Sequence, residues 1–268
     1  VIVNAILDPI FIWPLGLGIR GAAYATVLSQ LLALIWQLVM FSKKSEFIHF
    51  KRGIYRLRSR LVKNILAIGM SPFSMNVCAC FVVIIINNSL VSHGGDMAVG
   101  AYGIINRIAF IFVMVTIGVN QGMQPIAGYN YGAMKFDRMM RVLKYAVIGG
   151  TCVTTTGFIV GEVFPKQCVR LFTTDQTLID LSVHAMRITM ITFPIIGYQM
   201  VIANFFQSIG KAKVSISLSL SRQLLFLTPM LLVLPSLYGV DGVWYSMPVA
   251  DTISSVVTAI IMALFMRR

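Results

Sequence analysis

The chain has 268 residues, of which 57% are hydrophobic and only 12% are charged, and its mean hydropathy is +0.83. A soluble domain carries about twice that share of charged residues, so the composition excludes a soluble globular protein. The net charge of +13 does not indicate nucleic-acid binding, because the basic residues lie in short loops between apolar runs.

Six apolar runs are near or above the roughly 20 residues that a helix needs to cross a bilayer. They lie at 65–86, 101–119, 145–161, 188–206, 214–235 and 243–266. A transmembrane barrel would instead show alternating segments of about ten residues, and the sequence has none. The expected fold class is therefore an all-α polytopic membrane protein.

In chain order, the end of a helix at 1–14 precedes an outer turn at 15–20 and a returning helix at 21–41. The basic segment at 42–62 mixes Lys and Arg with aromatic and aliphatic residues. It is expected either to lie on anionic headgroups or to form a solvated loop. The predicted domains are the last two helices of an N-terminal lobe (1–41), a basic cytoplasmic connector (42–62) and a C-terminal six-helix lobe (63–268).

The six helices of this last part are predicted from their apolar runs and the turn residues between them. Their expected ranges are 63–91, 98–126, 142–164, 181–209, 212–235 and 242–266. The connections are an outer turn at 93–96, an inner loop at 127–141, an outer loop with a short helix at 165–180, an inner turn at 210–211 and a last outer turn. Prolines within these spans are expected to kink the helices, namely Pro72, Pro125, Pro194, Pro229 and Pro248.

Basic residues gather on one side of the membrane if these six spans alternate. Sixteen Lys and Arg residues fall in segments 42–63, 127–144, 211–213 and 267–268, against three (Arg20, Lys166 and Arg170) in the opposite loops. Positively charged loops remain in the cytoplasm. We therefore expect a multi-pass protein of the cytoplasmic, or inner, membrane with a cytoplasmic C-terminus.

Two stretches of the chain repeat the same pattern at a constant offset of 221 residues. The matched pairs are Pro14 and Pro235, Gly18 and Gly239, Gly21 and Gly242, and Tyr24 and Tyr245. A repeat of this length in a membrane protein is typical of a transporter built from two halves. The offset leads us to expect that roughly 160 residues, equivalent to 63–221, precede Val1 in the intact protein.

Four ionisable residues lie at membrane depth, where charged groups are costly and commonly functional. Arg107 and Asp251 lie at equal depth, so we expect an ion pair between them, with a purely structural role left open. Arg187 is near a helix end and is able to snorkel to the headgroups. Arg222 is expected to pair with backbone carbonyls or to line a cavity.

Uncharged amides form a second group of candidates, because many amides on neighbouring helices favour a central aqueous cavity over lipid contact. Taken singly, each amide also serves as a contact between helices, worth about 0.6 kcal/mol. The predicted substrate and ion pathway is Asn76, Asn87, Asn106, Arg107, Asn120, Gln124, Gln199, Asn204, Gln207, Arg222 and Asp251.

Catalytic and metal-binding motifs are missing from the sequence. The four cysteines and three histidines show neither disulfide nor metal spacing, and no phosphate-binding glycine loop follows a strand. We therefore expect no enzymatic activity, no metal and no cofactor.

Five blocks of the sequence resemble the multidrug and toxic compound extrusion (MATE) family. They are QGMQPIAGYNYGA at 121–133, NAILDPIFI at 4–12, GIRGAAYAT at 18–26, YGIINR at 102–107 and QSIGKAK at 207–213. The resemblance covers nearly the whole chain and implies twelve helices in two lobes of six. This chain then carries helices 5–12, so we expect an N-terminally truncated fragment that does not transport alone.

The resemblance also implies a function, namely an antiporter that exports organic cations and other drugs in exchange for Na⁺ or H⁺ by alternating access. The best-known coupling carboxylate of the family lies in helix 1, and one branch also uses an acidic residue in helix 7. Here no Asp or Glu occurs between Leu66 and Asp96, so the expected coupling site is in the first lobe.

The expected partners are small-molecule drugs or organic cations and the lipid bilayer, without nucleic acid, and the expected state is a monomer. A flippase for lipid-linked oligosaccharides or polysaccharides with the same two-lobe architecture is the alternative. Its pyrophosphate substrate calls for several cationic groups in the cavity, and the three arginines at 107, 187 and 222 keep that alternative open.

Overall fold

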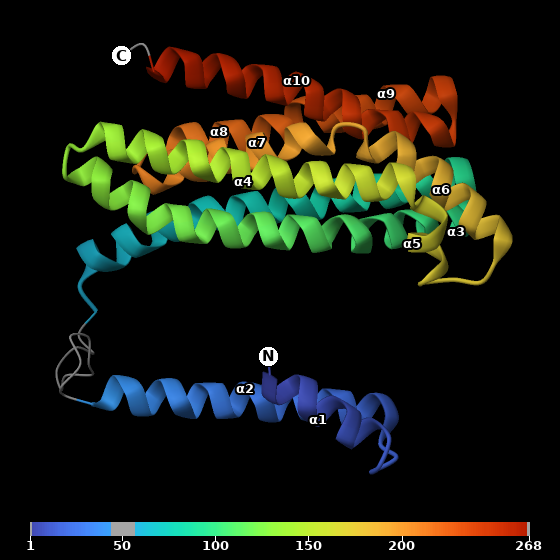
Figure 1. Cartoon of the computed structure of the whole chain (residues 1–268), viewed down its shortest axis with the longest axis horizontal. Coiled ribbons are helices and arrows are strands. Elements are labelled where there is room, and N and C mark those ends of the chain that lie inside the picture. The colour runs from blue at the N-terminus through green and yellow to red at the C-terminus, as the bar shows by residue number, and fades with distance from the viewer. Residues whose placement is uncertain (1, 44–56, 267–268) are drawn as a thin grey trace. The chain divides into compact units, whose positions relative to one another are not determined.

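The computed structural model describes residues 2–43 and 57–266, apart from the side chains of residues 64, 67–69, 71, 72 and 212. The chain divides into two compact units, residues 1–66 and 67–268. Every regular element in the described ranges is helical, as Figure 1 shows. The predicted all-α class is thus confirmed, and most of the predicted connector, from 44 to 56, lies outside the described residues.

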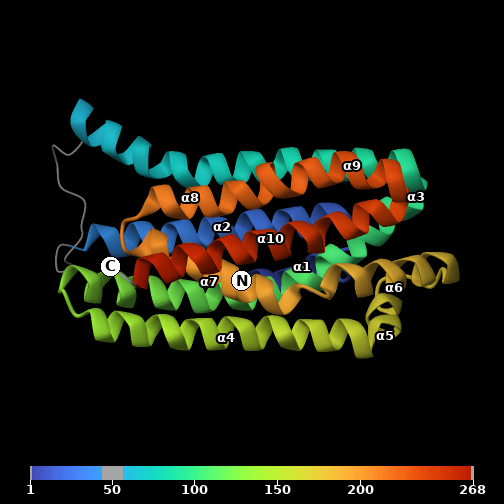
Figure 2. The ribbon, with the colours of Figure 1, turned by 90° about the horizontal axis from the view of Figure 1, so that it is seen from above.

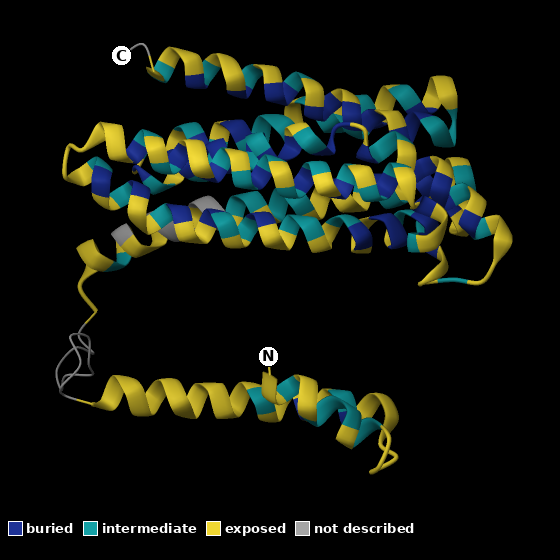
Figure 3. Ribbon diagram, viewed as in Figure 1, coloured by how far each residue is buried: buried dark blue, intermediate teal, exposed yellow. Residues whose placement is uncertain are grey.

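The first unit contains a pair of helices. Helix α1 (Ile2–Ile12) leads through a turn into α2 (Gly18–Ser42), and the two pack side by side. Helix α2 is long and apolar enough to cross a membrane, whereas α1 is shorter. Nearly all of α2 is exposed within its unit, with Gly21 and Ala25 as its buried residues (Figure 3).

Eight further α-helices and one π-helix are the remaining regular elements of the described residues. These are α3 (Ser59–Gly132), α4 (Phe136–Val163), α5 (Pro165–Arg170), α6 (Gln176–Met190), α7 (Phe193–Ser208), α8 (Ala212–Leu220), the π-helix η1 (Ser221–Leu227), α9 (Thr228–Tyr238) and α10 (Val240–Met266). The long helices of the second unit lie roughly along a common direction (Figure 2).

Helix α3 consists of two arms that meet at Gly95. Its 60-residue apolar part, Phe73–Gly132, would extend about 90 Å as a straight helix, three times the hydrocarbon thickness of a bilayer. Gly95 has φ 65° and ψ −167°, a conformation open essentially to glycine alone, and it reverses the chain there. The turn expected at 93–96 is therefore confirmed, and α3 supplies two of the expected membrane spans.

Three predicted boundaries are wrong. The inner loop expected at 127–141 is a short turn, because α3 continues to Gly132 and α4 begins at Phe136. The single helix expected at 181–209 is the pair α6 and α7, bent by 52° just before Pro194. The helix expected at 212–235 contains the π-helix η1 and continues to Tyr238.

The turns of the second unit sort into two ends with different charge (Figures 1 and 2). The α3–α4 turn with Lys135 and the α7–α8 turn with Lys211 lie at one end. The break in α3, the helix α5 and the α9–α10 turn lie at the other, which has Asp96 and Asp241 beside its turns and the basic residues Lys166 and Arg170 in α5. This arrangement agrees with the predicted alternation of the spans.

Small residues allow α4 and α7 to approach closely. The buried stripe of α4 includes Gly150, Thr154, Gly157 and Gly161, spaced three or four residues apart along one helix face. A Cβ atom on Gly197 of α7 would lie 2.6 Å from the carbonyl oxygen of Gly150. Close contact between small residues is the usual means of helix association in membranes, where the hydrophobic effect is weak.

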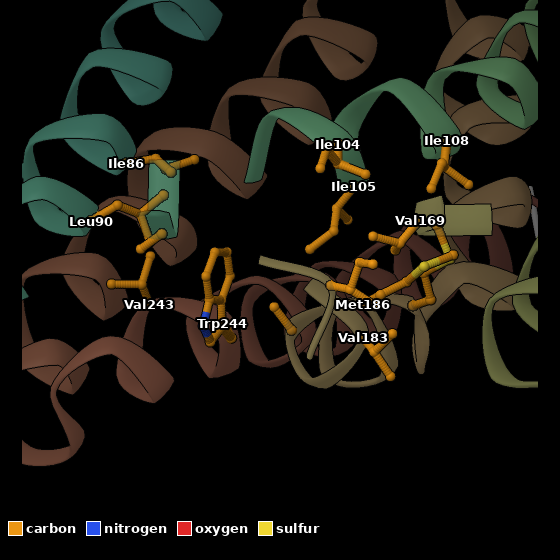
Figure 4. Close-up of a cluster of buried hydrophobic side chains, with 14 of the residues drawn as sticks. Ile86, Leu90, Ile104, Ile105, Ile108, Val169, Val183, Met186, Val243 and Trp244 are labelled. Carbon is orange, nitrogen blue, oxygen red and sulfur yellow. The ribbon is translucent and has the colours of Figure 1, made fainter. Parts of the chain in front are cut away.

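Two apolar clusters are separated by a polar layer halfway along the helices. One cluster joins α3, α5, α6 and α10, where Ile86 and Leu90 point toward Val243 and Trp244 (Figure 4). The other cluster contains Met123, Met139, Phe205, Phe206 and Met262. Between them in sequence are buried polar residues, which we call the polar layer: Thr116, Asn120, Thr154, Gln199, Asp251, Ser254 and Thr258.

The repeated sequence block adopts matching backbone conformations in its two copies. Gly18 and Gly239 both have positive φ, at 52° and 60°. A Cβ atom on Gly21 would lie 2.6 Å from the carbonyl oxygen of Phe11, and one on Gly242 would clash with the backbone of Leu234. The glycines are therefore required by the turn itself, which supports the interpretation of the block as a structural repeat.

We predict that Gly197→Ala destabilises the protein, because the added methyl group would collide with the α4 backbone. Overpacking of this kind costs about 1–3 kcal/mol and should lower the midpoint of thermal unfolding in detergent by several degrees. Gly122→Ala is the matched control, since no atom lies within 4 Å of its added Cβ. Alanine favours helix over glycine by about 1 kcal/mol, so that variant should be neutral or slightly stabilised, and an equal loss in both would contradict the packing argument.

Candidate functional site

A cavity of about 340 Å³ lies inside the second unit, among both arms of α3, α6, α7, η1 and α10. Its wall is mostly apolar, with the aromatic rings of Tyr102 and Phe193. The polar and charged residues that line it are Tyr102, Asn106, Thr189, Arg222, Gln223 and Asp251. Apolar cavities with a few convergent polar groups are typical ligand sites.

Asp251 is the most buried charged group of this cavity. The residue is 4% exposed, and its Oδ1 accepts a hydrogen bond from Nε of Arg222 at 2.6 Å. Asp251 lies near the middle of α10, whereas Arg222 lies in η1, about ten residues from the start of α8. The arginine side chain spans the difference in depth, so the pair joins η1 to α10.

The predicted pairing of Asp251 with Arg107 is wrong. Arg107 is exposed and has no ion-pair partner among the described residues. Equal depth along the helices does not bring the two side chains together, because Arg107 lies on a different face of α3. Its neighbours Ile105 and Asn106 line the cavity, and Arg107 does not. Arg187 forms a long, exposed ion pair with Glu162, with Nε and Oε2 3.9 Å apart, and does not line the cavity.

The sequence interpretation left Gln223 out of the site. This residue lines the cavity, and its Oε1 is buried without a hydrogen-bond partner in the described structure. Tyr102 was also omitted, although its hydroxyl group interacts with the side chain of Asn106. Helical spacing could have identified Tyr102 from the sequence. It lies four residues before the predicted site residue Asn106, so both side chains share one helix face, together with Ile105 and Ala109.

Several predicted amides join helices to one another and do not line the cavity. Nε2 of Gln124 donates to Oδ1 of Asn204 at 3.2 Å, and Nε2 of Gln199 donates to Oγ of Ser254. Asn120 is 2% exposed, and neither end of its amide has a partner in the described structure. Asn87 is half-buried, and Asn76 and Gln207 are exposed. Asn106, Arg222 and Asp251 are therefore the predicted residues that the structure brings to the cavity.

The first unit has a small polar cluster around Asp8, the residue before Pro9 in α1. Nδ2 of Asn4 lies 3.2 Å from Oδ1 of Asp8 and 3.4 Å from Oγ1 of Thr26. In the described structure Asp8 has no cationic partner, in contrast to Asp251. Carboxylate, amide and hydroxyl oxygens are the ligand types that bind hard cations. Within the described parts of the chain, no group of three or more His, Cys, Asp or Glu residues lies close enough together to hold a metal ion.

Comparison with known proteins connects these features to one family. The sequence profile described as MatE matches residues 72–232. The multidrug export protein MepA of Staphylococcus aureus strain MSSA476 is 26% identical over 265 residues, covering 99% of this chain and 58% of the relative. The MepA protein of Staphylococcus haemolyticus strain JCSC1435 is 27% identical over 251 residues, covering 94% of this chain and 55% of the relative. The chain thus spans little more than half the length of these relatives.

Solved structures show the same fold. The MATE multidrug transporter DinF-BH aligns with a TM-score of 0.82 at 33% identity, covering 98% of this chain and 59% of the other. A MATE structure in an outward-facing conformation aligns with a TM-score of 0.85 at 23% identity, covering 96% and 58%. The second similarity bears on the fold alone.

We predict that Arg222→Met is strongly destabilising, whereas Arg107→Met is not. Removing one partner of a buried ion pair leaves an unpaired charge and costs about 3–5 kcal/mol. Arg107 is exposed without an ionic partner among the described residues, so its replacement should change stability by less than about 0.5 kcal/mol.

Thermal unfolding of both variants in detergent checks this prediction. The double variant Arg222→Met/Asp251→Leu removes both charges and should recover most of the stability that Arg222→Met loses. An equal loss in Arg222→Met and Arg107→Met would contradict the pairing of Asp251 with Arg222.

Proposed function

Because the chain belongs to the MATE family, whose sequence profile covers residues 72–232, we propose that it is part of a secondary active multidrug efflux transporter. The transporter would export organic cations and other xenobiotics in exchange for Na⁺ or H⁺, by alternating access of two lobes. Since the chain spans 58% of its MepA relative, this proposal concerns the activity of the whole protein.

The cavity of the second unit is the single observation that carries this proposal. It combines an apolar wall and two aromatic rings with one buried carboxylate, that of Asp251. Such a wall accepts varied apolar groups, and a carboxylate and aromatic faces attract a cation. Met190, Met200 and Met247 also line it, and methionine adapts readily to ligands of different shape.

The predicted lobes and membrane orientation belong to the same proposal. We propose that residues 63–268 form the C-terminal lobe, 42–62 the connector and 1–41 the last two helices of the first lobe. The basic turns would face the cytoplasm in the inner membrane, together with the C-terminus. The protein would work as a monomer without a cofactor and without enzymatic activity.

A flippase for lipid-linked saccharides is not favoured. That function requires several cationic groups around a pyrophosphate, and of the three intramembrane arginines Arg222 lines the cavity while Arg107 and Arg187 do not. Arg222 is also paired with Asp251, which cancels its charge toward an anionic ligand.

We propose that ion coupling takes place at Asp8, in the first unit. Its carboxylate lies in an apolar helix and accepts a hydrogen bond from Nδ2 of Asn4, which also donates to Oγ1 of Thr26. Intramembrane ionisable groups without a fixed counter-ion commonly bind a proton or a metal cation. Asp251 is a weaker candidate for coupling because Arg222 already compensates its charge.

We predict efflux of ethidium, a fluorescent organic cation, from proteoliposomes that contain the full-length protein. Efflux should require an inwardly directed gradient of Na⁺ or of H⁺, and imposing the two gradients separately identifies the coupling ion. Protein-free liposomes are the control. If neither gradient drives efflux of ethidium, the proposed function is wrong.

We also predict that Asp8→Asn lowers gradient-driven efflux by roughly tenfold or more, because losing a charged contact of about 1.5–3 kcal/mol removes the coupling cation. Asp241→Asn is the matched control, since its carboxylate lies near the start of α10 and pairs with the half-exposed His184. The same assay measures both variants. Unchanged efflux in Asp8→Asn would place ion coupling elsewhere.

A further inference from the structure

The ion pair in the cavity of the second unit is unequal in its burial. The side chain of Asp251 is 6% exposed, whereas that of Arg222 is 32% exposed. The carboxylate is therefore fixed in the wall of the cavity, while the guanidinium group reaches it from a more open position. Of the two partners, Arg222 is the one that is able to leave.

The contact between Arg222 and Asp251 also contains a single hydrogen bond. Arg222 uses Nε alone, and its two terminal NH₂ groups have no hydrogen-bond partner among the described residues. A structural arginine–carboxylate pair is commonly bidentate, with two parallel hydrogen bonds. A single bond to a guanidinium group that is about one-third exposed is easier to exchange for another cationic contact.

A second acceptor and two aromatic rings lie around the same cavity. Oε1 of Gln223, the neighbour of Arg222, is buried without a partner in the described structure. Phe193 and Tyr102 contribute aromatic rings to the wall. An organic cation in the cavity thus has the carboxylate of Asp251, a free amide oxygen and aromatic faces within the lining.

From this geometry we propose that Arg222 is a resident cation that an organic cation displaces from Asp251 when it binds. The carboxylate of Asp251 is then paired with a cation both when the cavity is empty and when it is occupied. The displaced guanidinium group of Arg222 turns to the more open side of the cavity, toward which its side chain is already 32% exposed, and it competes there with any cation that enters. This inference rests on the proposed function, because it assumes that the cavity binds cationic ligands. It adds a specific role for Arg222, which lowers affinity for cations in general and rejects weak ones.

Two probes of the same shape and opposite charge test the exchange. Tetraphenylphosphonium is a permanent cation and tetraphenylborate is an anion of nearly equal size. Equilibrium dialysis at pH 8 measures the binding of each to the purified full-length protein in detergent. Arg187→Gln is the control, since this arginine lies outside the cavity and pairs with Glu162.

Removing the resident cation should strengthen the binding of the added one. In Arg222→Gln we expect tetraphenylphosphonium to bind about tenfold more tightly than in the wild type, because the competitor for Asp251 is gone. In Asp251→Asn the cation should bind about tenfold more weakly, and the released Arg222 should strengthen binding of tetraphenylborate. Weaker or unchanged cation binding in Arg222→Gln would overturn the exchange.

The test does not depend on the stability of Arg222→Gln, which leaves a carboxylate unpaired. Asp251→Asn and the double variant Arg222→Gln/Asp251→Asn both lack that carboxylate. The gain in tetraphenylborate binding should be present in Asp251→Asn and absent from the double variant, and an equal gain in both would overturn the inference. If no form of the protein binds tetraphenylphosphonium, the proposed function fails as well, whereas normal binding that ignores Arg222 refutes the exchange alone.

Discussion

A buried carboxylate near the middle of α10 is the constraint on which the second unit depends. Asp251 is 4% exposed, and an ionised carboxylate in such surroundings is stable only beside a cation or strong hydrogen-bond donors. Arg222 meets this need at 2.6 Å. The segment that carries Arg222 must therefore pack against α10, which it does along η1 and α9. The cavity lies where these elements face α3, α6 and α7.

The π-helix η1 is the local structure that meets this constraint. Both Arg222 and its neighbour Gln223 line the cavity from one end of this wider turn. Pro229 lies two residues beyond η1 and has no N–H group to donate to the preceding turn. The backbone N–H and the hydroxyl group of Thr228 both donate to the carbonyl oxygen of Gln223, the hydroxyl at 2.9 Å. A short π segment is common at functional sites, and here it supplies two polar side chains to one wall.

Turns marked by glycine could be predicted from the sequence, whereas the exact ends of the helices could not. The turns at Gly95 and Gly210 could be predicted because each glycine lies between two apolar runs. Both glycines adopt positive φ in the structure, a conformation that glycine reaches without strain. The predicted loop at 127–141 was wrong because α3 continues to Gly132, where Asn130 is 8% exposed and donates to the carbonyl oxygen of Ile126 within the helix. A side chain satisfied inside its own helix gives no sign of this in the sequence.

The partner of Asp251 could not be predicted from the sequence either. Residue spacing gives the depth of Arg107 and Asp251 along their helices but not the direction in which each helix is turned. A rotation of about 100° per residue separates Asn106, in the cavity wall, from Arg107. The partner of Asp251 could be recognised only once the packing of η1 against α10 was known, since Arg222 lies on a different level of the membrane and reaches the carboxylate with its long side chain.

The two copies of the repeat preserve the backbone and differ in where they place a carboxylate. At the constant offset of 221 residues, Asp8 corresponds to Pro229, and Asp251 corresponds to Gln30. The first copy has Asp8 before the turn, and the second has Asp251 after it, in addition to Asp241 at the start of α10. Asp8 has the neutral partner Asn4, which also donates to Thr26, whereas Asp251 has the cation Arg222. A carboxylate beside neutral groups is free to take up an ion from solution, and one that is already paired binds a cation only by exchange. The duplicated turn therefore presents two different electrostatic sites, which is the physical basis for assigning ion coupling and ligand selectivity to different parts of the chain.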